Sequence, residues 1–240
     1  MRNQKRIVMI TGGAKRIGRE IALGLSKEKY TFIIHFNKSR KEADNLVREI
    51  KNNGGDARSI KFDFSNTKSI EKFCKSSEML FGRVDILINN ASIFKSQNFY
   101  KIKEKDFDSM IRINLKAPFL LSKFLSKNMM KRKYGKIINI TDSIGTSKTW
   151  KDFSSYCISK GGVETMTKSL SLELGPYIQV NSIAPGRILK PITGSKKNLY
   201  RKISTSKIPL QSLINSIEFL IDSDFVTGES IHIDGGERLT

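Results

Sequence analysis

A tyrosine and a lysine four residues apart are the first candidates for chemistry. Tyr156 and Lys160 begin and end the stretch YCISK, and a spacing of four places both side chains on one face of a helix. A phenol, with a pKa of about 10, is a poor acid-base catalyst at neutral pH, but a nearby ammonium stabilises the phenolate and lowers that pKa. The pair therefore predicts a proton donor. Tyrosine and lysine also neighbour each other by chance on helix surfaces, so their place in the fold matters.

A glycine-containing turn is the second chemical signal. The stretch TGGAKRIG, residues 11–18, follows the apolar run RIVMIT and precedes a helical pattern. Glycines let the backbone turn tightly and approach a pyrophosphate, and the helix N-terminus adds N–H groups and a positive dipole end. At the first strand-to-helix junction, the pattern predicts a dinucleotide site. The alternative is a purely structural turn.

The elements that must position these residues alternate along the chain. Apolar strand-like runs are followed by amphipathic stretches, which is typical of a parallel sheet covered by helices on both faces. We expect a single α/β domain over 1–240, a Rossmann-type doubly wound sheet of about seven strands. The expected strands are 6–11, 31–36, 57–62, 85–89, 136–141, 178–184 and 229–234, and the expected helices are 16–28, 39–53, 67–80, 104–132 and 153–174.

The stretch 187–208 is polar, basic and weakly periodic. It follows the sixth predicted strand, so it belongs near the carboxyl edge of the sheet, where such folds bind ligands. We interpret it as a substrate-side loop, with a plain surface loop as the alternative.

Composition bounds the partners. No apolar stretch approaches the roughly 20 residues of a membrane span, the start of the chain does not resemble a signal peptide, and the two cysteines have no metal-ligand spacing. We expect a cytoplasmic protein with no metal site and no membrane contact. The net charge is +20, but the lysines are spread along the whole chain. This favours weak attraction to polyanions over a specific nucleic-acid partner.

Motifs over nearly the full length resemble those of the short-chain dehydrogenase/reductase family. Besides the glycine turn and YCISK, they are NNAS (89–92), RINLKAP (112–118), VNSIAPG (180–186) and TGESIHIDGG (227–236). The family usually has glycine where this chain has Arg16. Within the family, the form AKRIG is similar to pteridine reductases and dihydromonapterin reductases.

The resemblance implies roles for single residues. Asn114 would kink its helix and hold a water of the proton relay, and Asp63 would contact the adenine amine unless it simply caps the next turn. Relatives are usually homotetramers that pair the helices near 104–132 and 153–174. The implied cofactor contacts are Gly12, Arg16, Ile17, Gly18, Phe36, Asp63, Asn90, Ala91, Ser92, Tyr156, Lys160, Pro185 and Gly186.

The end of the second strand, HFNKSRKE, indicates the cofactor. An NAD-preferring fold usually has an acid here, whereas His35, Phe36 and Asn37 supply none. The residues that follow, Lys38 and Ser39 with Arg40, together with Arg16 offer positive charge and a hydroxyl to a 2′-phosphate. We therefore predict NADPH. The alternative is that these are ordinary solvated residues at a helix start.

Two adjacent residues compete for the slot that a serine fills in most of the family. Counting thirteen residues back from Tyr156 reaches Ser143, whereas the strand pattern before Gly145 places Asp142 there. Side chains alternate strictly along a strand, and the loop that follows absorbs an extra residue at little cost. We therefore favour Asp142.

Asp142 would change the chemistry. A second negative charge beside a developing alkoxide suits a ketone poorly, whereas a protonated acid can pass a proton through Tyr156 to a ring imine nitrogen. Pteridine reductases carry aspartate in this slot and an aromatic residue at the position of Phe94, which stacks on the pterin. The alternative is that Phe94 is only a hydrophobic anchor of its loop. We therefore predict an NADPH-dependent pterin or dihydropterin reductase. The alternatives are a reductase of acyl or sugar ketones that uses Ser143, and a non-catalytic protein that binds a dinucleotide or RNA.

Overall fold

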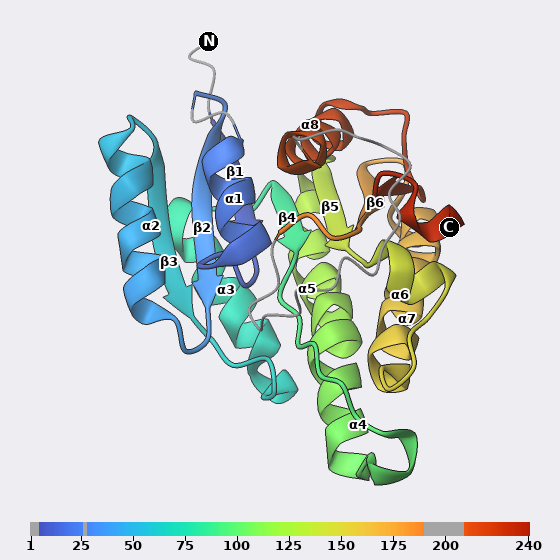
Figure 1. The fold of residues 1–240 in the computed structure, drawn as a ribbon. Helices are drawn as coiled ribbons and strands as arrows, with labels where there is room; N and C mark the ends of the chain where they lie inside the picture. The colour runs from blue at the N-terminus through green and yellow to red at the C-terminus, as the bar shows by residue number, and fades with distance from the viewer. Residues whose placement is uncertain (1–4, 26–27, 190–208) are drawn as a thin grey trace.

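A seven-stranded parallel sheet forms the centre of the molecule (Figure 1). The computed structural model describes residues 5–25, 28–189 and 209–240. The strand order is β3-β2-β1-β4-β5-β6-β7, and every neighbouring pair is parallel. The strands are β1 (Arg6–Ile10), β2 (Tyr30–Phe36), β3 (Asp56–Lys61), β4 (Ile86–Asn89), β5 (Gly135–Ile140), β6 (Ile178–Pro185) and β7 (Ser230–Ile233).

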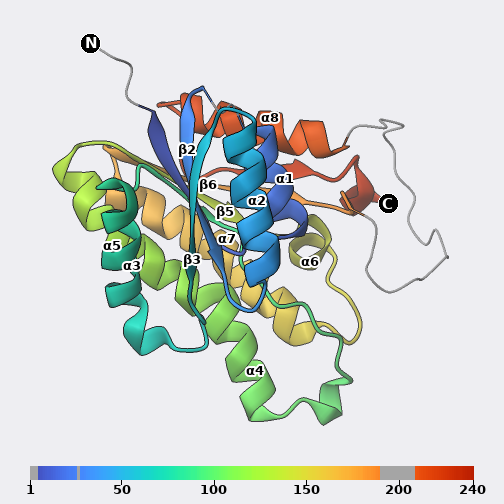
Figure 2. The ribbon, with the colours of Figure 1, turned by 90° about the vertical axis from the view of Figure 1, so that its left-hand side faces the viewer.

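Helices cover both faces of this sheet (Figure 2). One face carries α1 (Arg16–Gly24), α2 (Arg40–Asn52) and α8 (Pro209–Asp222), and the other carries α3 (Ile70–Phe81), α5 (Ala117–Lys131) and α7 (Ser154–Leu174). The shorter elements are α4 (Glu104–Ile111), α6 (Ser143–Ser147), the π-helical segment η3 (Arg112–Lys116) and the 3-10 turns η1 (Thr67–Ser69), η2 (Phe99–Lys101) and η4 (Glu237–Leu239).

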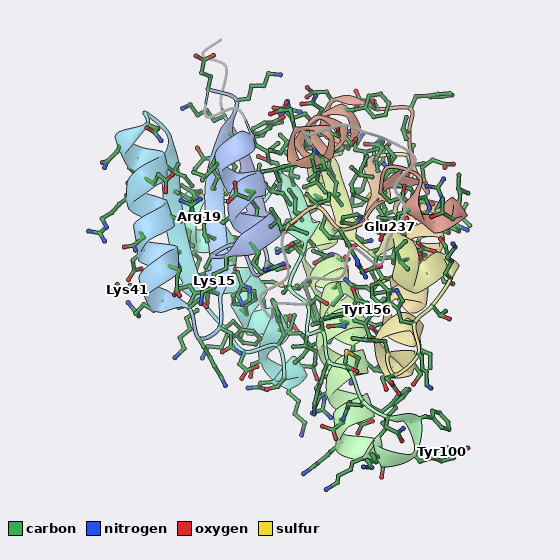
Figure 3. All side chains as sticks on the ribbon, in the orientation of Figure 1. Lys15, Arg19, Lys41, Tyr100, Tyr156 and Glu237 are labelled. Carbon is green, nitrogen blue, oxygen red and sulfur yellow. The ribbon has the colours of Figure 1, made fainter. Side chains whose placement is uncertain are left out.

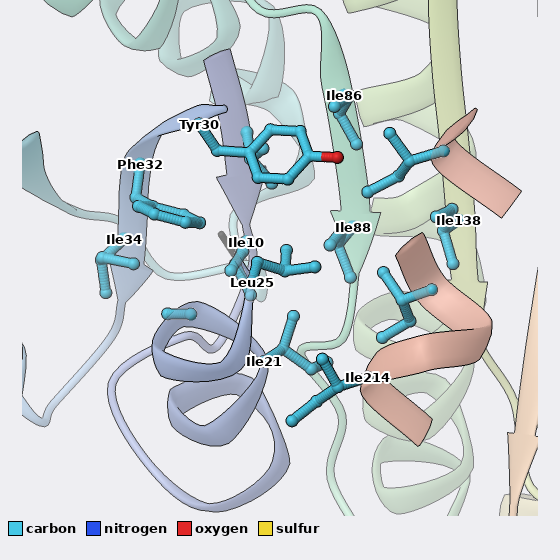
Figure 4. Packing of buried hydrophobic residues seen from close by; sticks show 14 of the residues in the cluster. Ile10, Ile21, Leu25, Tyr30, Phe32, Ile34, Ile86, Ile88, Ile138 and Ile214 are labelled. Atoms are coloured by element: carbon cyan, nitrogen blue, oxygen red, sulfur yellow. The ribbon is translucent and has the colours of Figure 1, made fainter. Parts of the chain in front are cut away.

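The two hydrophobic clusters follow from the alternation of strand side chains. In β1, Val8 and Ile10 face the cluster under α1, α2 and α8, while Ile7 and Met9 face the cluster under α3, α5 and α7. Figure 4 shows the first of these clusters, where Ile21 of α1 packs beside Ile214 of α8. Strands buried on both faces explain the continuous apolar runs of the sequence. The predicted single-domain α/β fold with about seven strands is confirmed.

The chain order reverses between β1 and β4. From β1 the chain moves outward to β2 and β3, and it then returns to place β4 on the other side of β1. The loops after β1 and β4 therefore diverge at the carboxyl edge, where open α/β sheets bind ligands. The glycine turn 11–18 and the segment NNAS both follow strands at this point.

The predicted helical region 104–132 is not one regular helix. The structure breaks it into α4, the π-helical segment η3 and α5, with Pro118 in the first turn of α5. Proline has no N–H to donate to the carbonyl four residues earlier, so the regular hydrogen-bond ladder cannot run through this point. The sequence interpretation also omitted α6 and α8. Most of the expected substrate-side loop, residues 190–208, lies outside the described residues.

None of the described helices combines the length and apolarity of a membrane span. Within the same residues, no group of three or more histidine, cysteine, aspartate or glutamate side chains is arranged to hold a metal ion.

Candidate active site

The glycine turn packs tightly against the loop after β4. Gly12 has φ 60°, and a Cβ added to Gly18 would lie 2.5 Å from the carbonyl oxygen of Gly12 and 2.6 Å from Nδ2 of Asn90. Only glycine fits such a close approach. Arg16, which stands where glycine is usual, has φ 51° and therefore adopts the left-handed conformation that favours glycine.

Side chains from two neighbouring strands hold the turn in place. Asn90 Nδ2 donates to the carbonyls of Thr11 and Gly12 at 2.9 and 3.1 Å, and Thr11 Oγ1 accepts from the backbone N–H groups of Asn90 and Ala91. The N–H of Gly12 donates to Nδ1 of His35 at 3.0 Å. Burial lowers the pKa of His35 to about 4, which keeps this ring neutral and able to accept.

The sequence analysis did not predict that His35 supports the glycine turn. This residue is next to last in β2, within an apolar strand, and its ring is buried. Its Nε2 lies 3.1 Å from the carbonyl of Phe62, so the neutral ring donates there and accepts from Gly12. A polar ring in an otherwise apolar strand is the sequence signal that marked it.

The residues of this edge fit the pyrophosphate of a dinucleotide. The turn leaves no room for side chains at Gly12 and Gly18, and no side-chain cap from Lys15 engages the first N–H groups of α1. Arg16 and Lys38 are exposed, and Ser39 stands at the start of α2 without a cap hydrogen bond from its side chain. These groups offer N–H donors and positive charge to phosphate oxygens.

Other predicted cofactor residues take varied positions. Phe36 is buried with Ala14 and Ala43, so its ring supports the turn from within the core. Asp63 Oδ1 accepts the N–H of Ser65 at 2.9 Å. Burial opposes ionisation of this carboxyl, but the Ser65 hydrogen bond is larger and lowers its pKa. Ile17 packs against the core cluster beneath α1. Asp63 thus closes a turn and is not the N-cap of the helical segments that follow, which begin after Asn66 and Ser69.

Asp142 and Tyr156 meet at the ends of β5 and α7. The phenol of Tyr156 donates to Oδ2 of Asp142 at 2.8 Å, while Oδ1 of Asp142 accepts the N–H of Gly145 at 2.6 Å and caps α6. A Cβ on Gly145 would lie 3.2 Å from both side chains, so glycine permits this close packing. Figure 3 labels Tyr156 and, to its left, Lys15, which precedes α1 at the glycine turn.

The electrostatics of Tyr156 differ from the prediction. Burial is the largest influence and raises its pKa well above the ordinary value, and the charge and hydrogen bond of Asp142 raise it further. Lys160 is fully buried, donates to the carbonyl of Ile140 at 2.8 Å and lies 5.8 Å from the centre of the Tyr156 ring. Burial lowers the pKa of Lys160 to about 8, against the opposing influence of Asp142. In the arrangement observed, burial and Asp142 therefore outweigh the lowering of the phenol pKa that was expected from Lys160.

Ser143 points to a different set of partners. Its hydroxyl donates to Oδ2 of Asp234 at 2.6 Å and lies 2.9 Å from Nδ1 of His232. Of the two residues that compete for the serine slot, Asp142 is the one that contacts Tyr156.

Asn114 occupies the π-helical segment and is buried. Its Oδ1 accepts the N–H of Ile93 at 2.8 Å, and its Nδ2 donates to the carbonyl of Ile93 and to Ser159 Oγ. The side chain thus fixes the loop that carries Phe94 and links it to α7. The expected helix kink is present as a change of hydrogen-bond register.

Aromatic rings surround the phenol. Phe94 meets Tyr156 edge to face at 4.7 Å, and its ring is stacked on Phe153 at 4.6 Å. Trp150 lies parallel to Tyr156 at 6.3 Å. Phe94 is 58% exposed, so it presents apolar surface outward from the group. The sequence interpretation included Phe94 but left Trp150 and Phe153 unassigned. Their position directly before YCISK was the available signal.

The remaining predicted contacts lie at the same edge. Ser92 is exposed beside Ile93, Pro185 ends β6, and Gly186 donates to the carbonyl of Ile233 at 2.9 Å. A Cβ on Gly186 would lie 2.7 Å from the Cβ of Asp234, so only glycine fits at this position. The structure thus brings the glycine turn, Asn90, Tyr156, Lys160 and Pro185 to one edge of the sheet.

Comparisons with known proteins show to which family this chain is similar. The family model for short chain dehydrogenase matches residues 6–200. The 3-oxoacyl-[acyl-carrier-protein] reductase of Buchnera aphidicola is 38% identical over 247 residues, covering 98% of each chain. A FolM alternative dihydrofolate reductase 1 from Brucella canis, solved with NADP, is 28% identical with a TM-score of 0.89, covering 98% of this chain and 94% of that one.

An acetoin dehydrogenase from Enterobacter cloacae is 26% identical with a TM-score of 0.86, covering 98% of this chain and 96% of that one. The substrates in these names differ, whereas the family model and the fold are shared. The chain therefore belongs to the short-chain dehydrogenase family and is an oxidoreductase that works with a nicotinamide dinucleotide.

Proposed function

We propose that this enzyme reduces a pterin or dihydropterin with NADPH. The observation that carries the proposal is the 2.8 Å hydrogen bond between Tyr156 and Asp142. A hydroxyl in the place of Asp142 would serve a ketone oxygen, whereas a carboxyl group can supply a proton to a ring nitrogen. NADPH, when bound, supplies the hydride.

The residues of the chain would then handle one proton. The proton that the imine nitrogen gains leaves the hydroxyl of Tyr156, and Asp142, which accepts the hydrogen bond of this phenol, would relay a proton from solvent to the phenolate oxygen. The ammonium of Lys160, buried nearby, favours the transient phenolate by its charge. The high pKa of Tyr156 keeps the phenol protonated before this transfer.

Phe94 supports a flat substrate. Its ring is backed by Phe153 and held at the phenol by contact with Tyr156, yet more than half of it is exposed. A flat heteroaromatic ring gains from offset stacking on such a surface. Asn114 fixes the backbone next to Phe94 and so orients this wall.

The cofactor preference rests on charge. No carboxylate ends β2, and two cations are exposed, Arg16 at the start of α1 and Lys38 just before α2. A 2′-phosphate carries nearly two negative charges and strong acceptors, which these groups suit. The relative from Brucella canis, solved with NADP, supports the same preference.

Reduction of a 3-oxoacyl thioester is the second candidate. The Buchnera aphidicola relative carries that name at 38% identity. In that mechanism a serine hydroxyl would donate to the substrate carbonyl. Here the hydroxyl of Ser143 has one proton, and Asp234 accepts it at 2.6 Å. This contact favours the pterin reaction.

The two candidate functions are distinguished by the substrate that the enzyme reduces and by the effect of a substitution at Asp142. We expect NADPH oxidation with 7,8-dihydropterin and little with acetoacetyl-CoA. The substitution Asp142→Ser keeps a hydrogen-bond partner for Tyr156 but removes the acid, so kcat with dihydropterin should fall about 100-fold. Brisk acetoacetyl-CoA reduction by the wild type, with dihydropterin ignored, would overturn the proposal in favour of the acyl ketone.

We also propose that the enzyme assembles as a homotetramer. Large apolar side chains are exposed on the two helical regions named for pairing: Phe119 is 43% exposed on α5, and Ile158 and Leu172 are 55% and 87% exposed on α7. Covering such surface stabilises association. Light scattering of the purified protein measures the mass directly, and a monomer would contradict this proposal.

A further inference from the structure

A buried polar network joins the carboxyl-terminal turn to α6. Asp234, just after β7, accepts from Ser143 Oγ at 2.6 Å, from the N–H of Gly236 at 2.9 Å, and from Arg238 through both its backbone N–H and its guanidinium at 3.2 Å. Burial opposes ionisation of Asp234, but these hydrogen bonds outweigh it and lower its pKa. Asp234 is therefore a fixed anionic acceptor.

This anion determines the direction of the bonds at Ser143. A hydroxyl has one proton to give, and the carboxylate of Asp234 receives it. The Ser143 oxygen must then accept from Nδ1 of His232 at 2.9 Å. Ser143 is fully buried, so both partners are required to satisfy it.

Ser143 is the residue directly after Asp142 and the first of α6. The helix α6 has only five residues, too few to hold its own orientation. It packs against α7 and against the carboxyl-terminal turn η4. Asp142 divides its two oxygens between the N–H of Gly145 and the phenol of Tyr156, so a small rotation of α6 would break the second contact.

We propose that Asp234 is a positioning residue that acts through Ser143 to hold the carboxyl group of Asp142 against Tyr156. The carboxyl-terminal turn thereby sets the geometry of the proton relay, although it contributes no group to the reacting atoms. The effect of this positioning on the reaction rate rests on the proposed function, but the positioning of Asp142 itself does not.

The test measures the phenol itself, so it needs no substrate. Protein labelled with ¹³C at tyrosine Cζ is titrated by NMR, and the signal of Tyr156 is assigned by its loss in Tyr156→Phe. Asp142 raises the pKa of this phenol through its charge and hydrogen bond. Ser143→Ala and Asp234→Ala should therefore lower the Tyr156 pKa by about one unit, a tenfold change in the ionisation constant.

Two further variants make the result specific. Asp234→Asn keeps an oxygen acceptor for Ser143 and should retain most of the wild-type pKa. Ser77→Ala removes another fully buried hydroxyl, one that bonds only within α3, and should leave the Tyr156 pKa unchanged. Thermal melts followed by circular dichroism show which variants are folded.

The outcomes separate the two proposals. If Ser143→Ala is folded and its Tyr156 pKa equals that of the wild type, the positioning role is overturned. If the pKa falls in Ser143→Ala and Asp234→Ala alone, the role is supported, and kcat with dihydropterin should fall about tenfold with KM for NADPH unchanged. A wild type that ignores dihydropterin but shows the same pKa pattern overturns the substrate and supports the positioning.

Discussion

Lys160 donates to the carbonyl of Ile140 at 2.8 Å while its ammonium lies 5.8 Å from the centre of the Tyr156 ring. The end of β5, not the phenol, therefore holds this buried charge. Lys160 acts on Tyr156 through space, and Asp142, which bonds the phenol directly, dominates its electrostatics together with burial. A YxxxK pair alone thus leaves the proton affinity of the tyrosine undetermined.

The charge state of Lys160 predicts a basic limb in the pH profile. Burial lowers its pKa to about 8, so the ammonium is present below that pH and is lost as the pH rises through it. The transient phenolate then loses a favourable charge, and kcat/KM should fall with a midpoint near pH 8. Lys160→Arg keeps a charge well above pH 10, so any activity it retains should lack this limb.

Steady-state rates between pH 6 and 10, with NADPH oxidation followed at 340 nm, measure the limb. A wild-type profile that stays level through pH 9 would contradict this assignment. So would an arginine variant with the same midpoint as the wild type.

His35 predicts acid sensitivity of the fold. Its ring has a pKa of about 4 in the folded protein and about 6.5 when unfolded. Between these values the unfolded chain binds a proton that the folded ring refuses, so stability is complete above about pH 6.5 and falls as the pH drops toward 4. The expected loss from this residue is about 3 kcal/mol.

Urea unfolding at pH 7.0 and pH 4.5 measures this loss. His35→Gln has no ionisable ring, so its stability should change less between the two pH values, although the variant starts lower because Gly12 loses its acceptor. An unchanged difference between pH 7.0 and pH 4.5 would assign the acid sensitivity to other groups. NADPH affinity should also weaken in this variant, because the glycine turn loses support.

Arg16 combines backbone strain with charge. Its φ of 51° favours glycine, so Arg16→Gly should raise the free energy of unfolding by about 1 kcal/mol and increase Tm. The same change removes a cation from the predicted 2′-phosphate region, so the ratio of NADPH to NADH affinity should fall about tenfold. Differential scanning fluorimetry and nucleotide titrations measure the two effects.

The control is Arg40→Ala, which removes another exposed cation, one that pairs with Asp44 and has a helical backbone. It should lack the gain in Tm. If Arg16→Gly lowers Tm instead, the left-handed backbone is not strained. If it leaves the NADPH to NADH ratio unchanged, Arg16 does not recognise the phosphate.

The fold was predictable because its signals are local. Apolar runs such as those of β1 and β5 are buried on both faces, and their alternation with amphipathic helices specifies a parallel sheet. The break at η3 does not follow from periodicity, because α4 and α5 together keep a continuous helical pattern; the resemblance of Asn114 to a helix-kinking asparagine was the signal for it. The local pattern of residue types indicates helical periodicity, but it does not indicate which backbone groups hydrogen-bond to each other.

The site was predictable only in part, for a physical reason. The motifs predicted that the glycine turn, Asn90, Tyr156 and Lys160 lie at one edge of the sheet. Residue counting left Asp142 and Ser143 in competition, because a one-residue difference is absorbed by the loop before α7. The partners that separate them, Tyr156 and Asp234, are distant in sequence. The raised pKa of Tyr156 likewise depends on burial, which only the packed chain determines.

Asn114 predicts a coupling between fold stability and the aromatic wall. Asn114→Ala would remove one hydrogen bond from each backbone group of Ile93, next to Phe94, and should lower the free energy of unfolding by about 1–3 kcal/mol. The freed loop should also raise KM for the dihydropterin more than KM for NADPH, because Phe94 loses its orientation. Asn114→Asp keeps the acceptor for the Ile93 N–H and should be intermediate in both.

The matched control is Asn128→Ala on α5, which removes a hydrogen bond to Glu78 on the outer face of the molecule. It should cost less stability and leave both KM values unchanged, because its partner is a side chain in contact with solvent. Equal increases in the two KM values of Asn114→Ala would indicate a general loosening of the edge. A rise confined to the KM for the dihydropterin would place the effect at Phe94, because Asn114 bonds both backbone groups of the neighbouring Ile93.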